Sequence, residues 1–137
     1  MVTDRLTDGV RLAQLLASEV TGNESRLRGL TVVDADRDVE PTADGALAYR
    51  IARERDDSDD GNERGDPVAE VYVQPDRVRI EATVAADAAA TAARDADLRA
   101  RPKATRPPRT LVFVEDGAQV KRALAVLEAV RRGPQSE

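Results

Sequence analysis

Apolar residues in the first part of the chain recur every three or four positions between Thr3 and Thr21. This spacing places them on one side of a helix, with Thr3 as the expected N-cap and the glycine after Thr21 as the stop. Gly9 lies inside this helix and is expected to cost about 1 kcal/mol relative to alanine. Leu12 and Leu15 widen the apolar stripe, so we expect the helix to contact both a sheet and a neighbour.

The middle of the chain contains segments that are rich in β-branched residues or alternate between apolar and polar side chains. These segments predict strands at residues 30–35, 46–53, 68–73 and 78–84. The last two are separated by a short segment in which Pro75 and Asp76 favour a turn. They therefore predict a β-hairpin.

The pattern changes after residue 84. Residues 85–97 are rich in alanine and predict a helix with small packing side chains. Residues 98–104 are compatible with a further strand at the edge of a sheet. The most hydrophobic strand is predicted at residues 110–115, and we expect it to be central. Asp116 then predicts the start of the last helix, with Gln119 at the capping-box position.

The order of elements is therefore helix, four strands, helix, one or two strands, helix. It predicts a single α+β domain over residues 1–137, with an antiparallel sheet of five or six strands and three helices gathered on one face. Residues 55–66 contain no apolar side chain and predict a flexible acidic loop. Residues 133–137 predict a frayed C-terminal tail.

The amino-acid composition suggests that the stability of this fold depends on salt. Charged residues make up 34% of the chain, and 26 Asp and Glu against 21 Lys and Arg give a net charge of −5. Much of the apolar content is alanine, so the core is expected to be modest. Concentrated salt screens carboxylate repulsion and strengthens apolar burial. We therefore expect the fold to depend on molar salt.

The residue types that are absent exclude several chemistries. The chain has no Cys and no His, which rules out disulfides, thiol nucleophiles, thiolate zinc sites and imidazole bases. No apolar run has the length of a membrane span, and the N-terminus does not have the pattern of a signal peptide. We expect a cytoplasmic, non-catalytic protein without a cofactor and without membrane association.

Alternate carboxylates at Asp34, Asp36 and Asp38 are the candidate for metal chemistry. Oxygen ligands of this kind can hold a hard cation. The run fails as an EF-hand, because Val39 takes the place of the required glycine and Gly45 the place of the bidentate glutamate. It superficially resembles the phosphotransfer motif of haloacid-dehalogenase enzymes, but Asp38 stands where that motif has threonine or valine. A solvated acidic turn is favoured over a cation site or a carboxylate-based enzyme.

Charge is segregated along the chain, with acids in excess over residues 34–66 and bases in excess over residues 98–132. The candidates for binding a partner or nucleic acid are Arg99, Arg101, Lys103, Arg106 and Arg109. A basic stretch can follow phosphates, but counterion release gains little in molar salt and residues 98–109 contain no ring on which bases could stack. Pairing with the acidic 34–66 region, within the chain or between subunits, is favoured over partner docking and over nucleic acid.

The opening DRLTDGVRLAQLLASEVTG and the closing RPPRTLVFVEDGAQVKRALAVLEAVRR resemble the two ends of a family of small uncharacterised acidic haloarchaeal proteins. The resemblance implies no activity and no functional residues. The order of elements is also similar to secretion-chaperone-like folds, which dimerise and hold partners, at the level of fold alone. The leading hypothesis is protein–protein interaction, as a homodimer through a helix face or strand edge or with another protein. A nucleic-acid-associated accessory protein is the alternative.

Overall fold

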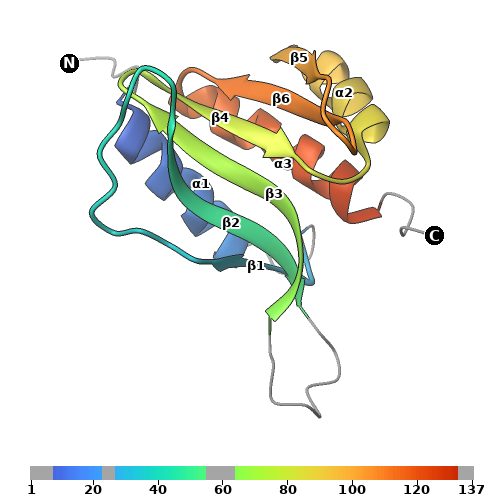
Figure 1. Ribbon diagram of the computed structural model, residues 1–137, viewed down its shortest axis with the longest axis horizontal. Helices are drawn as coiled ribbons and strands as arrows, with labels where there is room; N and C mark the ends of the chain where they lie inside the picture. The colour runs from blue at the N-terminus through green and yellow to red at the C-terminus, as the bar shows by residue number, and fades with distance from the viewer. Residues whose placement is uncertain (1–7, 23–26, 55–63, 133–137) are drawn as a thin grey trace.

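A computed structural model describes residues 8–22, 27–54 and 64–132. These residues form a six-stranded antiparallel sheet with the helices on one of its faces (Figure 1). The helices are α1 (Gly9–Gly22), α2 (Ala86–Asp95) and α3 (Gly117–Arg132), and the strands are β1 (Leu30–Val33), β2 (Ala46–Glu54), β3 (Arg64–Gln74), β4 (Arg77–Ala82), β5 (Arg99–Lys103) and β6 (Arg109–Val114). The predicted α+β class and order of elements are confirmed.

The predicted acidic loop is shorter than expected on its C-terminal side. Strand β3 begins at Arg64 rather than at Val68, and its pairing with β2 extends to Glu54 opposite Arg64. Backbone pairing with β2 therefore outweighs the polar character of residues 64–66. The rest of the predicted loop, residues 55–63, and the predicted tail, residues 133–137, lie outside the described residues.

The strands lie in the order β1-β2-β3-β4-β6-β5. Strands β1 to β4 follow one another as neighbours, and α2 then carries the chain past the sheet so that β6 pairs with β4 and β5 takes the outer edge. Strand β6 pairs with β4 on one side and β5 on the other, so residues 110–115 form an interior strand as predicted, although this strand is next to the edge rather than in the middle of the sheet. Leu111 and Phe113 in β6 are only half-buried, so this strand is apolar on both sides without being covered on both.

The core lies between the helices and the sheet. Alternate side chains of β3, β4 and β6 point into it and are fully buried: Val71, Val73, Val78, Ile80, Val112 and Val114. Leu12 and Leu16 of α1 are fully buried in the same cluster, and Leu15 packs partly against it. The wide apolar stripe of α1 is therefore used largely within the chain.

Helix α1 begins beside the turn that joins β3 and β4. Asp8 caps it, since its Oδ1 accepts hydrogen bonds from the amides of Val10 (3.0 Å) and Arg11 (3.3 Å). The predicted N-cap, Thr3, lies outside the described residues. The amide of Gly9 donates to the carbonyl oxygen of Pro75 (3.2 Å). A β-carbon at Gly9 would collide with the backbone of this turn, so glycine is required here for packing.

Helix α3 begins at the predicted capping box. Asp116 Oδ1 accepts a hydrogen bond from the amide of Gln119 (2.9 Å), and Gln119 Oε1 accepts one from the amide of Glu115 (2.7 Å). The two side chains thus satisfy amides on both sides of the helix start. This cap fixes the point at which the chain leaves β6.

Candidate functional site

The three helices leave one face of the sheet uncovered (Figure 1). Strand alternation places on it the side chains that lie between the core positions. The basic ones are Arg50, Arg77, Arg79, Arg99, Arg101, Lys103 and Arg109, the acidic ones are Glu70, Glu81 and Glu115, and the others include Tyr72, Leu111 and Phe113. We call this surface the open face. Bases outnumber acids on it, although the whole chain is acidic.

Rings and guanidinium groups alternate in a row across the open face. Tyr72 of β3 is opposite Arg79 of β4, which is opposite Phe113 of β6, which is opposite Arg99 of β5. The Arg79 guanidinium carbon lies 4.5 Å from the centre of the Tyr72 ring, and that of Arg99 lies 6.0 Å from the centre of the Phe113 ring. Both distances suit a cation–π contact. An arginine therefore already occupies one face of each ring.

Two carboxylates lie opposite one another in the middle of the open face. Glu70 of β3 pairs in register with Glu81 of β4, an arrangement that is destabilising when the charges are not compensated. The same nitrogen of Arg109, Nη1, donates to Glu70 Oε1 (3.0 Å) and to Glu81 Oε1 (2.8 Å). Arg109 thus serves as the shared counter-ion of both glutamates.

Glu81 is only 1% exposed although no helix covers this side of the sheet. Arg79 Nε donates to its Oε2 (2.9 Å), and Lys103 Nζ lies 3.5 Å from its Oε1. Together with Arg109, these basic side chains form its cover. A buried carboxylate is stable only when charged donors satisfy it. The network therefore holds β3, β4, β5 and β6 together from the outside.

Glu70 has a further set of donors. The hydroxyl of Tyr72 donates to its Oε1 (2.6 Å), and Arg50 Nε donates to its Oε2 (3.2 Å). Burial by itself raises the pKa of the Glu70 carboxyl, but these hydrogen bonds and the charge of Arg109 outweigh it and leave the pKa below its ordinary value. Glu70 therefore stays charged and remains an acceptor.

The two tyrosines are expected to resist ionisation near pH 10. Burial first, and the hydrogen bond to Glu70 second, raises the pKa of Tyr72 to about 12. Burial also raises the pKa of Tyr49, whose hydroxyl donates to the carbonyl oxygen of Ala13 (2.7 Å). Each tyrosine keeps its proton in the folded chain and loses it near pH 10 in the unfolded chain. Stability present below pH 10 is therefore expected to fall as the pH rises from about 10 towards 12.

The measurement is an alkaline titration of tyrosinate absorbance, which is simple to interpret because the chain has two Tyr and no Trp. We expect the first step of the folded protein near pH 12, and its loss in Tyr72→Phe. A full one-tyrosine step near pH 10, while circular dichroism still shows the folded state, would contradict the burial of these hydroxyls.

The structure brings most of the predicted basic candidates together. Arg99, Arg101 and Lys103 lie along β5, and Arg109 begins β6, all on the open face; Arg106 lies in the turn between the strands. Three of them form ion pairs within the chain: Arg99 Nη1 lies 2.9 Å from Glu115 Oε2, Lys103 pairs with Glu81, and Arg109 pairs with both Glu70 and Glu81.

The predicted acceptors of these bases are wrong for the described residues. Glu70, Glu81 and Glu115 lie outside the acidic 34–66 region. The reason is the strand order, which puts β3 and β4 between β2 and the β6–β5 end of the sheet. Arg101 and Arg106 are exposed and have no ion-pair partner in the part of the chain that the structure describes.

The metal candidates do not converge. Asp34 pairs with Arg50, its Oδ2 lying 3.2 Å from Nη1, and Asp36 Oδ1 accepts a hydrogen bond from the amide of Asp38 (2.9 Å). Among residues 8–22, 27–54 and 64–132, no group of three or more acidic, histidine or cysteine side chains is placed to hold a metal ion. Asp34 instead forms an ion pair with β2, and Asp36 and Asp38 form a local turn after β1.

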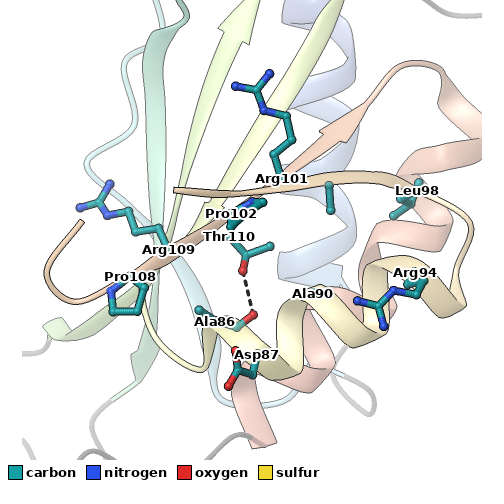
Figure 2. Close-up of a pocket in the computed structure, with 11 residues that line it drawn as sticks. Ala86, Asp87, Ala90, Arg94, Leu98, Arg101, Pro102, Pro108, Arg109 and Thr110 are labelled. Carbon is teal, nitrogen blue, oxygen red and sulfur yellow. Dashed lines mark hydrogen bonds between the residues drawn. The ribbon is translucent and has the colours of Figure 1, made fainter. Parts of the chain in front are cut away.

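A cavity of about 370 Å³ lies between α2 and the β5–β6 edge. Its walls combine short side chains, including Ala86, Ala90 and Ala100, with charged ones such as Asp87 and Arg94. Thr110 Oγ1 donates to the carbonyl oxygen of Ala86 (2.8 Å; Figure 2). The Arg101 side chain extends from β5 on the side away from α2 (Figure 2). Two of the basic candidates, Arg101 and Arg109, nevertheless line part of the cavity, whereas Arg99, Lys103 and Arg106 do not, so the cavity does not gather the whole set.

A family model described as a family of unknown function (DUF7993) matches residues 1–137. The chain belongs to this family. Membership in DUF7993 assigns no activity, so the open face has to be interpreted from its own geometry. Neither the curated proteins nor the solved structures compared with the chain include a significant match. Within the described residues, no helix combines the length and apolar character needed to cross a membrane.

The central residues of the open face were not among the sequence candidates. Glu70, Tyr72, Arg79 and Glu81 are the polar positions of the predicted hairpin, and Phe113 lies in the predicted strand 110–115. The signal that could have found them is the alternation itself, since it puts the polar positions of paired strands on the same face. The pairing of strands therefore identifies the central residues of the open face better than the basic stretch does.

Proposed function

We propose that the chain is a non-catalytic protein-binding module in a salt-adapted cytoplasmic protein of the haloarchaeal type, and that its binding surface is the open face. The observation that carries the proposal is the continuity of this surface, on which half-buried Leu111 and Phe113 lie among arginines. Aromatic residues and arginine are enriched at protein interfaces and provide much of their binding energy.

Two features support a role without catalysis. The chain has no His and no Cys, so proton transfer or nucleophilic attack would have to rely on carboxylates or hydroxyls. The two carboxylates at the centre of the open face are already engaged by charged donors, Glu70 by Arg50 and Arg109, and Glu81 by Arg79 and Arg109. The carboxylate oxygens of Glu70 and Glu81 are therefore not available to act as a base or nucleophile on a substrate.

Several contacts favour a protein partner over nucleic acid. The rings that could stack with bases, Tyr72 and Phe113, each have an arginine on one face. Arg79 and Arg109 at the centre of the surface are already engaged by Glu70 and Glu81, so these arginines are not available to follow a phosphate backbone. Binding of nucleic acid through Arg101 and Arg106 remains the second candidate, and it depends on electrostatics that molar salt weakens.

We further propose that the partner is a different protein rather than a second copy. Leu12 and Leu16, which belong to the stripe that suggested a homodimer, are buried in the chain's own core. A two-fold dimer through the open face would bring two surfaces with the same excess of positive charge together. Strand β5 carries charged residues and Pro102 at the sheet edge, features that discourage edge-to-edge pairing.

The experiment is affinity capture from cells of the source organism, in molar salt, with two double variants. Arg101→Glu with Leu111→Ala alters the open face, and Arg11→Glu with Arg122→Glu alters exposed positions of α1 and α3. We expect one protein to be captured by the wild type and by the helix variant, and to be reduced at least tenfold with the open-face variant.

Three results would overturn the proposal. The first is capture that survives the open-face variant but is lost with the helix variant. The second is capture that a nuclease abolishes, which would favour the nucleic-acid alternative. The third is light scattering that shows a dimer disrupted by the open-face variant, which would make the partner a second copy.

A further inference from the structure

The bases of the open face and of the turn between β5 and β6 fall into two groups with different contacts. Arg79 and Arg109 are directed at Glu70 and Glu81, and their side chains are only 15% and 28% exposed. Arg101 and Arg106 are exposed, with no ion-pair partner among the described residues. Uncompensated positive charge therefore lies at the β5 end of the face, whereas the centre is internally neutralised.

Arg99 belongs with the outer group. Its side chain is 70% exposed, and it contacts Glu115 through Nη1 alone. A guanidinium group presents five N–H donors in a planar fork, so much of the hydrogen-bonding capacity of Arg99 remains accessible. Phe113, opposite Arg99, and Leu111, opposite Arg101, provide apolar surface directly beside these donors.

From these contacts we infer that the partner of the open face presents an extended segment with carboxylates at alternate positions. The segment lies edge-on over β5 and β6, so that its carboxylates bind Arg99 and Arg101 on β5 while the intervening side chains turn towards Leu111 and Phe113 on β6. The inference rests on the proposed function and specifies the chemistry of the partner. Arg106 is exposed in the turn that follows β5 and adds positive charge to this end of the sheet.

The spacing of the donors supports an extended ligand. Arg99 and Arg101 are two residues apart on one strand, so their side chains leave the sheet on the same side about 7 Å apart. Side chains at alternate positions of an extended segment have the same separation. Two carboxylates of such a segment can each meet one guanidinium group in a bidentate contact.

Attraction between charged groups in direct contact also persists in concentrated salt. At molar ionic strength the Debye length is about 3 Å, so only charges in contact still attract one another appreciably. Apolar burial is strengthened under the same conditions. A ligand that combines carboxylates with apolar side chains fits a salt-adapted surface better than one that depends on long-range attraction.

The test uses a fluorescein-labelled peptide that alternates Glu and Val, with a Lys-Val peptide and an oligo(dT) strand as comparison probes, and measures fluorescence anisotropy in low and molar salt. We expect the Glu-Val peptide to bind in both conditions and the Lys-Val peptide not to bind. Arg101→Glu with Arg106→Glu is expected to weaken binding at least tenfold, because it replaces two positive charges with negative ones. Neither arginine has an ion pair among the residues that the structure describes, so no such pair is lost on folding.

The matched control is Arg11→Glu with Arg122→Glu, which makes the same change of charge on the helix side and is expected to leave binding unchanged. Preference for oligo(dT), equal effects of the two double variants, or no binding of the Glu-Val peptide would overturn the inference. If the peptide fails while affinity capture still depends on the open face, the partner chemistry is wrong and the binding module stands. If both fail, the proposed function fails as well.

Discussion

Replacing Gly9 with alanine is expected to destabilise the protein by about 3 kcal/mol, the upper part of the range for inserting an atom into a filled space. A β-carbon at this position would overlap the carbonyl oxygen of Gln74 and lie 2.9 Å from that of Arg77 and 3.0 Å from Val73 Cγ1. Two of these atoms are backbone atoms of the β3–β4 turn, so they cannot rotate away. The start of α1 would have to leave the sheet.

The expected sign is the opposite of what helix propensity alone predicts, since alanine favours a helix over glycine by about 1 kcal/mol. Gly22→Ala is the matched control, because a β-carbon there has nothing within 4 Å, and it should leave stability unchanged or slightly raised. The measurement is the free energy of unfolding from denaturant titration. Equal stability of the two variants would show that α1 does not pack on the turn as described.

Glu81→Gln is expected to cost about 3 kcal/mol, because removing one member of a buried ionic network leaves the others uncompensated. Arg79, Lys103 and Arg109 converge on this carboxylate, which is 1% exposed. The amide keeps the shape of the side chain, so the loss reports on charge and hydrogen bonding rather than on a cavity. Part of the deficit should disappear in molar salt, which screens repulsion among the remaining cations.

Glu115→Gln provides the control for this prediction. Glu115 also binds two arginines, Arg77 (3.3 Å) and Arg99 (2.9 Å), but its side chain is 28% exposed. Pairs of this kind typically contribute less than about 1 kcal/mol. Denaturant titrations of both variants, in low and molar salt, should separate them. Similar small losses for the two would mean that the basic cover over Glu81 is open to water.

The elements of the fold could be predicted from local patterns, and their order in the sheet could not. The alternation in β3 and β4, the Pro75-Asp76 turn and the Asp116 cap each depend on neighbours in sequence. The pairing of β6 with β4 depends on where α2 packs, which no short pattern contains. Because of that pairing, β6 lies next to the edge of the sheet and β5 forms the edge.

The candidate surface could be predicted only in part, because its basic residues form a local sequence pattern and their acidic partners do not. Arg99, Arg101, Lys103 and Arg109 were visible as a local excess of charge. Their partners were sought in the most acidic part of the chain, although contact depends on strand register rather than on charge density. Glu70 and Glu81 are isolated glutamates in sequence, and only the register that sets them opposite one another and beside Arg109 shows their importance.

The bridge from Arg109 to both glutamates also limits how this surface can evolve. If Arg109 changes first, Glu70 and Glu81 are left as like charges on facing strands. If Glu70 changes first, Arg109 and the other bases that converge on Glu81 keep their partner. Substitutions that begin with Glu70 should therefore be tolerated more often than those that begin with the arginine, and related chains without this arginine are expected to have lost at least one of the two glutamates.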